Sequence, residues 1–130
     1  MKQISCYKYS ILVALVIVVL STIPVPEVKP LEEVPLIDKW VHFLMYATLS
    51  VAMWWDCRSR HQSISVSDYI LMLVLPTLLG GLMELVQAYL TTCRSGDWLD
   101  AIADAIGAML GPAVCYVISV IWKEKTSTQR

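Results

Sequence analysis

The sequence has little charge, and long stretches of it have none. Charged residues make up 16% of the 130 residues, whereas hydrophobic residues make up 57%. A soluble domain of this size needs more polar surface than this composition can supply. Ten basic residues against eleven acidic ones also leave no excess positive charge, so we expect no nucleic-acid partner.

Familiar catalytic and cross-linking patterns are also missing. The sequence contains no HExxH, no Gly-x-Ser-x-Gly and no P-loop. Its four cysteines form no CxxC pair and fall at different predicted depths, which predicts neither a disulfide framework nor a cysteine zinc site. We therefore expect no cofactor other than a divalent cation, and the sequence leans away from an enzyme.

The sequence does contain four apolar segments of a length suited to membrane crossing. A membrane helix needs about 17–25 residues. A soluble four-helix bundle would show a polar stripe along every helix, and YSILVALVIVVLSTI shows none. The pattern predicts an all-α fold, a four-helix transmembrane bundle that forms a single domain over residues 1–130. The helices are expected at about 7–23, 37–55, 69–90 and 98–122.

The basic residues predict the orientation of this bundle. With four crossings and a cytoplasmic N-terminus, seven of the ten would face the cytoplasm: Lys2, Lys8, Arg58, Arg60, Lys123, Lys125 and Arg130. This asymmetry obeys the positive-inside rule, so both termini are predicted to be cytoplasmic. The apolar N-terminus resembles a signal peptide, but STIPVPEV offers no small-x-small cleavage site, and we expect the first helix to be retained.

The last apolar segment begins with three carboxylates, in DWLDAIADAIGAMLG at 97–111. At 100° per residue, Asp97, Asp100, Asp104, Gly107 and Gly111 share about 80° of the helix surface. The glycines continue the acidic face as a Gly-x-x-x-Gly surface, where a second helix can approach closely. The acidic side is therefore predicted to be the packed side, although Asp97 also fits a simple helix N-cap.

Two other helices bring polar residues to the same depth. Gly80, Glu84 and Gln87 lie within about 60° of one another, and Asp38 and His42 lie one turn apart. Counted at 1.5 Å per residue from the outer ends of their helices, the histidine and Glu84 lie about 7 and 9 Å inside the membrane. The acidic face of the last helix reaches about 10 Å.

Ionisable residues inside a membrane are expensive and mark functional sites by default. We therefore predict a ligand-binding polar layer under the outer face, made of Asp38, Lys39, His42, Glu84, Gln87, Arg94, Asp97, Asp100 and Asp104. Its helix-packing positions are Gly80, Gly107 and Gly111. The alternative is a purely structural hydrogen-bond network, with Asp38 and Lys39 as solvated flanks.

Two segments resemble the VanZ-like family of small bacterial membrane proteins. LIDKWVHFLMY is like the family's Asp-Lys-x-x-His-Phe-x-x-Tyr pattern, at Asp38, Lys39, His42, Phe43 and Tyr46. The segment GGLMELVQAYLTTCRSGDWLDAIADAIGAMLG is like its Glu-x-x-Gln and Arg-x-x-Asp-x-x-Asp-x-x-x-Asn-x-x-Gly-x-x-x-Gly, which maps onto Glu84, Gln87, Arg94, Asp97, Asp100, Gly107 and Gly111. Asp104 stands where the family usually has Asn.

The resemblance implies a multi-pass protein of the bacterial inner (cytoplasmic) membrane. The family is named for a member that raises resistance to the glycopeptide teicoplanin, so the implied partners are the lipid bilayer and a lipid-linked cell-wall precursor or a glycopeptide. Three hypotheses stay open. The polar layer binds a lipid headgroup through Arg94 and Lys39, or it is a membrane enzyme acting on a lipid-linked phosphate through His42 and the acids, or it only holds helices or subunits together.

Overall fold

Four α-helices make up the computed structural model, which describes residues 7–23, 36–60, 63–90 and 97–128. The helices are α1 (Lys8–Thr22), α3 (Ile37–Arg60), α4 (Val66–Leu90) and α5 (Trp98–Thr128). The described residues contain no strand, which confirms the predicted all-α fold with four helices. Two predicted helix ends differ most: α3 continues past Trp55 to Arg60 and α5 continues past Trp122 to Thr128, because polar residues beyond an apolar segment can extend a helix.

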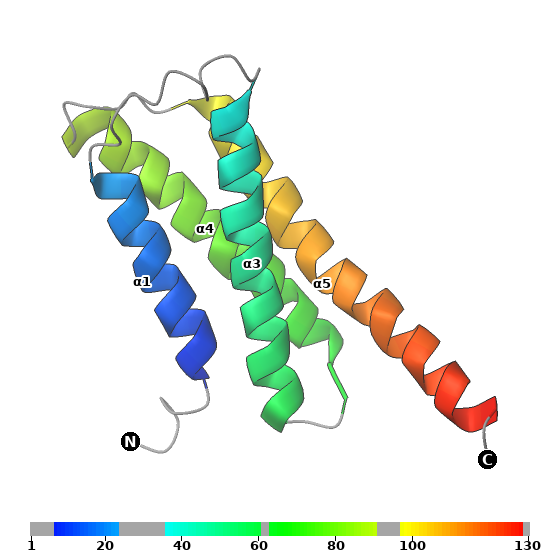
Figure 1. Ribbon diagram of the computed structural model, residues 1–130. Coiled ribbons are helices and arrows are strands. Elements are labelled where there is room, and N and C mark those ends of the chain that lie inside the picture. Colours follow the sequence, from blue (N-terminus) through cyan, green and yellow to red (C-terminus); the bar gives the residue numbers. More distant parts are fainter. Residues whose placement is uncertain (1–6, 24–35, 61–62, 91–96, 129–130) are drawn as a thin grey trace.

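The helices run alternately up and down (Figure 1). The start of α1, the end of α3, the start of α4 and the end of α5 lie at one end of the molecule. α3 is central and contacts the other three helices, while α1 packs on α3 and α4 at the side away from α5. The polar side of α3, which includes His42 and Asp56, is therefore covered by the neighbouring helices.

Side-chain caps define where the helices begin. Ser65 and Asp68 form a reciprocal capping box before α4, with the Asp68 carboxylate accepting from the Ser65 backbone N–H at 2.8 Å. At α1 the cap comes from another helix, since buried Asp56 of α3 accepts from the backbone N–H and the hydroxyl of Ser10. These bonds satisfy N–H groups that a helix start leaves without partners.

Glycines of α5 let it lie directly against α3. A Cβ atom at Gly107 would lie 2.3 Å from the carbonyl oxygen of Phe43, and one at Gly111 would lie 2.7 Å from that of Ala47. Both neighbours are backbone atoms of α3, so any side chain there would push the two helices apart. The predicted Gly-x-x-x-Gly surface is a helix-packing surface, and its partner is α3.

The outer surface of the described helices is largely apolar. α4 and the Trp98–Trp122 part of α5 are each 25 residues long and apolar enough to cross a membrane. α1 is apolar but shorter, with 15 residues. α3 has a polar side formed by residues such as His42 and Asp56, and that side is buried inside the protein.

Candidate polar site

One end of the bundle brings charged residues of three helices together. Buried there are His42 of α3, Glu84 of α4, and Asp100 and Asp104 of α5. Lys39, Asp38 and Asp97 adjoin them. We call these seven residues the polar cluster, and it unites seven of the nine predicted ligand-binding residues. Within it, five carboxyl groups face one ammonium and one imidazole.

The upper half of the polar cluster is centred on Lys39. Its Nζ lies 2.6 Å from Asp38 Oδ2, 2.6 Å from Asp97 Oδ2 and 2.8 Å from Asp100 Oδ1. The lysine side chain is only 16% exposed, so it is no solvated flank, whereas the Asp38 side chain is 57% exposed. We call these four residues the lysine-centred group, in which three carboxylates surround one ammonium.

Asp97 has two roles at the start of α5. Its Oδ1 accepts from the backbone N–H of Leu99 at 2.9 Å, as an N-cap does, and its Oδ2 pairs with Lys39. The hydrogen bond from the Lys39 ammonium holds the pKa of the Asp97 carboxyl below its usual value. The sequence left open whether Asp97 is an N-cap or a residue of the polar layer, and in the structure it is both.

The deeper half of the polar cluster is centred on His42. Its Nδ1 lies 3.0 Å from Asp104 Oδ1 and 3.8 Å from Glu84 Oε1, and its Nε2 lies 3.9 Å from Asp100 Oδ2. We call His42, Glu84 and Asp104 the histidine-centred group. Asp100 contacts both groups, so the two halves form one continuous network.

Glu84 is held in place from the lysine-centred side. Its Oε2 accepts from the backbone N–H of Asp97 at 2.7 Å, which links α4 to the start of α5. This bond uses one carboxylate oxygen and leaves Oε1 directed at His42. Among the described residues Oε1 has no hydrogen-bond partner, and the same holds for Asp104 Oδ2.

Gly80 is the reason that Asp104 can approach α4. A Cβ atom at Gly80 would lie 2.4 Å from Asp104 Oδ2 and 2.9 Å from the aspartate Cβ. The predicted packing role of this glycine is therefore specific, because it makes space for the carboxylate of the deeper group.

Of the two remaining predicted site residues, the structure describes one. Gln87 of α4 is buried, and its amide donates to the backbone carbonyl of Ser21 in α1 at 3.1 Å. Arg94 lies outside the described residues, as do the acidic, proline-rich segment at 24–35 and the cysteines at positions 6 and 93. The predicted role of Arg94 in binding phosphate stays a prediction.

Tyr46 belongs beside the site, although the sequence suggested only packing for it. Its side chain is fully buried, and among the described residues its hydroxyl has no hydrogen-bond partner. The signal for its position was its spacing, since it follows His42 by four residues and so lies one turn deeper on the same face.

An apolar groove between α4 and α5 leads to the polar cluster. Its volume is about 530 Å³, and its walls are formed by Thr77, Leu78, Gly81, Leu82, Leu85, Ala88, Tyr89, Trp98 and Ala101. Glu84 and Asp97 line the same groove, so carboxylates stand beside its apolar walls. The sequence could not reveal this groove, because it depends on how two helices pack.

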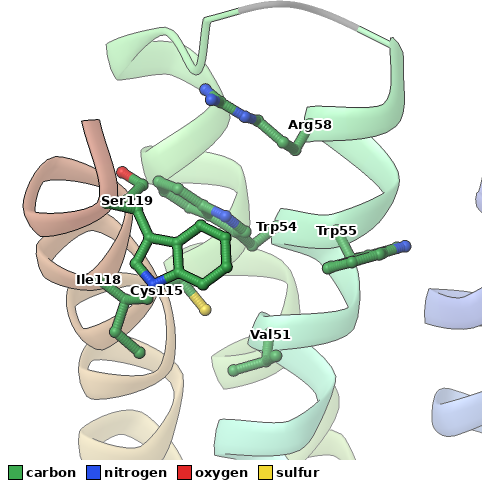
Figure 2. Close-up of a pocket in the computed structure, with 8 residues that line it drawn as sticks. Val51, Trp54, Trp55, Arg58, Cys115, Ile118 and Ser119 are labelled. Atoms are coloured by element: carbon green, nitrogen blue, oxygen red, sulfur yellow. The ribbon is translucent and has the colours of Figure 1, made fainter. Parts of the chain in front are cut away.

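A second groove of about 450 Å³ lies between α3 and α5 near the opposite end. Figure 2 shows Trp54 reaching from α3 toward Cys115 and Ser119 of α5, with Arg58 at the end of the same α3 face. The polar cluster does not adjoin this groove, so it is separate from the predicted site.

The polar cluster can hold a cation or a group rich in hydrogen-bond donors, because its acceptors outnumber its donors. A buried histidine beside carboxylates also has the parts needed for proton transfer. No protein-family model, curated protein or solved structure matches the chain.

Proposed function

We propose that the chain is a four-pass membrane protein with both termini in the cytoplasm. Beyond the two long apolar helices, α1 and α3 also expose large apolar side chains outward, among them Leu12, Leu15, Trp40 and Leu44. Lipid would cover these faces, which water would otherwise contact. α1 spans about 22 Å, and thinning of the bilayer together with snorkelling of Lys8 accommodates this short length.

The charge distribution supports the orientation. Lys8, Arg58 and Arg60 lie at the end of the bundle where α1 starts and α3 finishes. The polar cluster, with its excess of carboxyl groups, lies at the other end. The positive-inside rule assigns the basic end to the cytoplasm, so the polar cluster faces the outer leaflet.

We further propose that the protein binds a lipid through the α4–α5 groove and the polar cluster. The groove is the observation that carries this function. It combines an apolar channel, open to the acyl chains of the bilayer, with the carboxylates of Glu84 and Asp97 beside it. Its volume falls within the about 300–1,000 Å³ typical of ligand sites, and apolar walls with a few polar groups are the usual arrangement.

The carboxylates define the headgroup that fits. Lys39 is already surrounded by three carboxylates, so a phosphate at its ammonium would have to displace an ion pair. Glu84 and Asp97 instead offer acceptors for hydroxyl, amide or amine groups. A headgroup with sugar and peptide groups satisfies these acceptors, and Arg94 is proposed to contact the phosphate that joins it to the tail.

The VanZ-like resemblance fits this chemistry. Cell-wall precursors carry sugar and peptide groups on a lipid-linked phosphate, and glycopeptide antibiotics compete for such precursors. We therefore propose that the chain is a VanZ-like protein of the bacterial cell envelope. A role in tolerance of a glycopeptide such as teicoplanin would follow from binding the same lipid.

Native mass spectrometry in mild detergent tests the lipid site. Gly81 lines the groove, and a Cβ atom there would meet no other atom within 4 Å, so Gly81→Leu fills the groove without disturbing the helices. We expect the wild type to retain a lipid adduct and Gly81→Leu to lose it, because the leucine occupies the position of the tail. Glu84→Gln and Arg94→Ala should weaken the same adduct through the headgroup.

Ala113→Leu is the matched control. It adds an apolar side chain at an exposed position of α5 that lines neither groove. We expect this variant to carry the wild-type adduct. Equal adducts on the wild type, Gly81→Leu and Glu84→Gln would overturn the lipid proposal and leave the polar cluster as a structural network.

A further inference from the structure

The two halves of the polar cluster differ in how their negative charge is compensated. In the lysine-centred group, one ammonium lies within 2.8 Å of three carboxylates. The histidine-centred group has no such cation among the described residues. A neutral imidazole donates only one hydrogen bond. His42 Nδ1 lies within hydrogen-bond distance of Asp104 Oδ1, at 3.0 Å, but not of Glu84 Oε1, at 3.8 Å. Two buried carboxylates therefore share one imidazole.

Two carboxylate oxygens of this deeper group have no hydrogen-bond partner among the described residues: Glu84 Oε1, which faces His42, and Asp104 Oδ2, which lies against Gly80. Glu84 is 9% exposed and Asp104 is 1% exposed. A buried polar atom that makes no hydrogen bond costs about 1–3 kcal/mol, and more if it is charged. The hydroxyl of Tyr46 is a third such buried atom. The arrangement calls for a further positive charge.

We propose that His42, Glu84 and Asp104 bind a divalent transition-metal ion, of which Zn²⁺ fits best and Mn²⁺ next. The three residues each offer one ligand atom, and these atoms all lie within 4.8 Å of one another. His42 Nδ1 is 3.0 Å from Asp104 Oδ1 and 3.8 Å from Glu84 Oε1. Ligands at about 2.05 Å in a tetrahedral zinc site are separated by about 3.3 Å, which lies between these two distances.

The donor set and its surroundings favour such an ion over Mg²⁺ or Ca²⁺. An imidazole is a good ligand for zinc, whereas Mg²⁺ and Ca²⁺ prefer six or more oxygen ligands. The ion would replace the proton between His42 Nδ1 and Asp104. The opposite ring nitrogen, Nε2, lies 3.9 Å from Asp100 Oδ2, which is beyond hydrogen-bond distance, and a small shift of this carboxylate toward Nε2 would let it orient the metal-bound histidine. Three protein ligands leave a fourth position for water or for a ligand group.

This inference goes beyond lipid binding and does not depend on it, because it rests on the histidine-centred group alone. If both proposals hold, the ion is also the positive charge that an anionic headgroup would need in a site rich in carboxylates. Metal content and lipid adducts are separate measurements, so one proposal can fail while the other stands.

The test is metal binding by the full chain in detergent. After removal of metals with a chelator, the wild type is titrated with Zn²⁺ and Mn²⁺ in competition with a fluorescent indicator, and bound metal is counted by inductively coupled plasma mass spectrometry. We expect one ion per chain. Glu84→Gln and Asp104→Asn remove the charge while keeping the shape, and each should weaken binding by at least about 100-fold, beyond the usual effect of residues that only support a metal ligand.

Asp68→Asn is the control, since it removes a carboxylate from the cap of α4, at the end of the bundle opposite the polar cluster, and Asp68 belongs to neither group of possible metal ligands. It should keep the wild-type affinity. Helicity measured by circular dichroism identifies a variant that has not folded, and Glu84→Gln and Asp104→Asn test the site independently of each other. A folded wild type that binds neither ion above the detergent blank would overturn the proposal. Undiminished binding in the folded variants would do the same.

Discussion

Lys39 links the ends of two helices through its ammonium group. Its partners are Asp97, which precedes α5, Asp100 in the first turn of α5, and its own neighbour Asp38. An ion pair between exposed side chains contributes about 0–1 kcal/mol at most, but here the lysine side chain is largely buried and has three partners. Removing the lysine would leave these carboxylates to repel one another, so it positions the start of α5.

The Lys39–Asp97 pair predicts a dependence of stability on pH. Because the folded-state pKa of Asp97 is lowered by the lysine, its contribution to stability is present above the unfolded pKa of about 3.9 and is lost as pH falls through the folded value. Asp97→Asn keeps an N-cap residue and removes only the charge.

We expect wild type to melt at a higher temperature than Asp97→Asn at pH 7, and the difference to shrink below pH 4. Melting temperatures of both proteins in detergent, followed by circular dichroism, provide the check. The difference should also shrink in high salt, because the aspartate is partly exposed. A difference that stays constant from pH 7 to pH 3 would show that the charge of Asp97 does not stabilise the fold.

At the scale of the helices, the direct contact between α3 and α5 determines the geometry of the site. Gly107 and Gly111 lie on the same face of α5 as Asp100 and Asp104. When this face packs on the α3 backbone at Phe43 and Ala47, the aspartates are placed next to His42. The glycine pair is thus occupied within the chain, which argues against its use as a contact between subunits.

Gly107→Ala tests this contact. The new Cβ would lie 2.3 Å from the Phe43 carbonyl oxygen and 3.0 Å from the Ala47 nitrogen, so the two backbones must separate. Overpacking of this kind costs about 1–3 kcal/mol, and we expect the melting temperature in detergent to fall. Gly81→Ala is the control, because its Cβ meets nothing and alanine favours a helix, so it should not destabilise. Equal melting of the two variants would contradict the close approach of α3 and α5.

At the scale of the whole molecule, the two ends of the bundle differ in the sign of the charge that predominates on α3 and its neighbours. Arg58 and Arg60 occupy the end where α3 finishes, and the polar cluster occupies the end where α3 starts. This polarity predicts which end faces the cytoplasm. The proposed site then opens toward the outside of the cell, where envelope lipids are found.

Cysteine labelling of intact cells tests this orientation. Leu36 and Ser63 are exposed and lie before α3 and before α4, at opposite ends of the bundle. In a background with the four native cysteines changed to serine, a membrane-impermeant maleimide should label Leu36→Cys directly. Ser63→Cys should react only after the cells are permeabilised. The reverse pattern would place the polar cluster on the cytoplasmic side, and labelling of both in intact cells would contradict a membrane span between them.

The local pattern of the sequence was enough to predict the helices and the polar face of each one. A helix and its packed face depend on residues that lie within a few turns of one another. The length of the apolar segments and their period of 3.6 residues therefore predicted four helices and the burial of Asp104, Glu84 and His42. The close approach at Gly107 could be predicted as well, because a Gly-x-x-x-Gly spacing needs only one helix to be recognised.

The tertiary structure alone decided which residues become partners. Lys39 pairs with Asp97 and Asp100, and His42 lies beside Asp104, because the rotation of α3 against α5 depends on packing between residues about 60 positions apart. The same packing directs Gln87 to α1 and opens the groove between α4 and α5. A one-dimensional pattern specifies the face of a helix but not the neighbour that it meets, since that neighbour is selected by the shape of the assembled bundle.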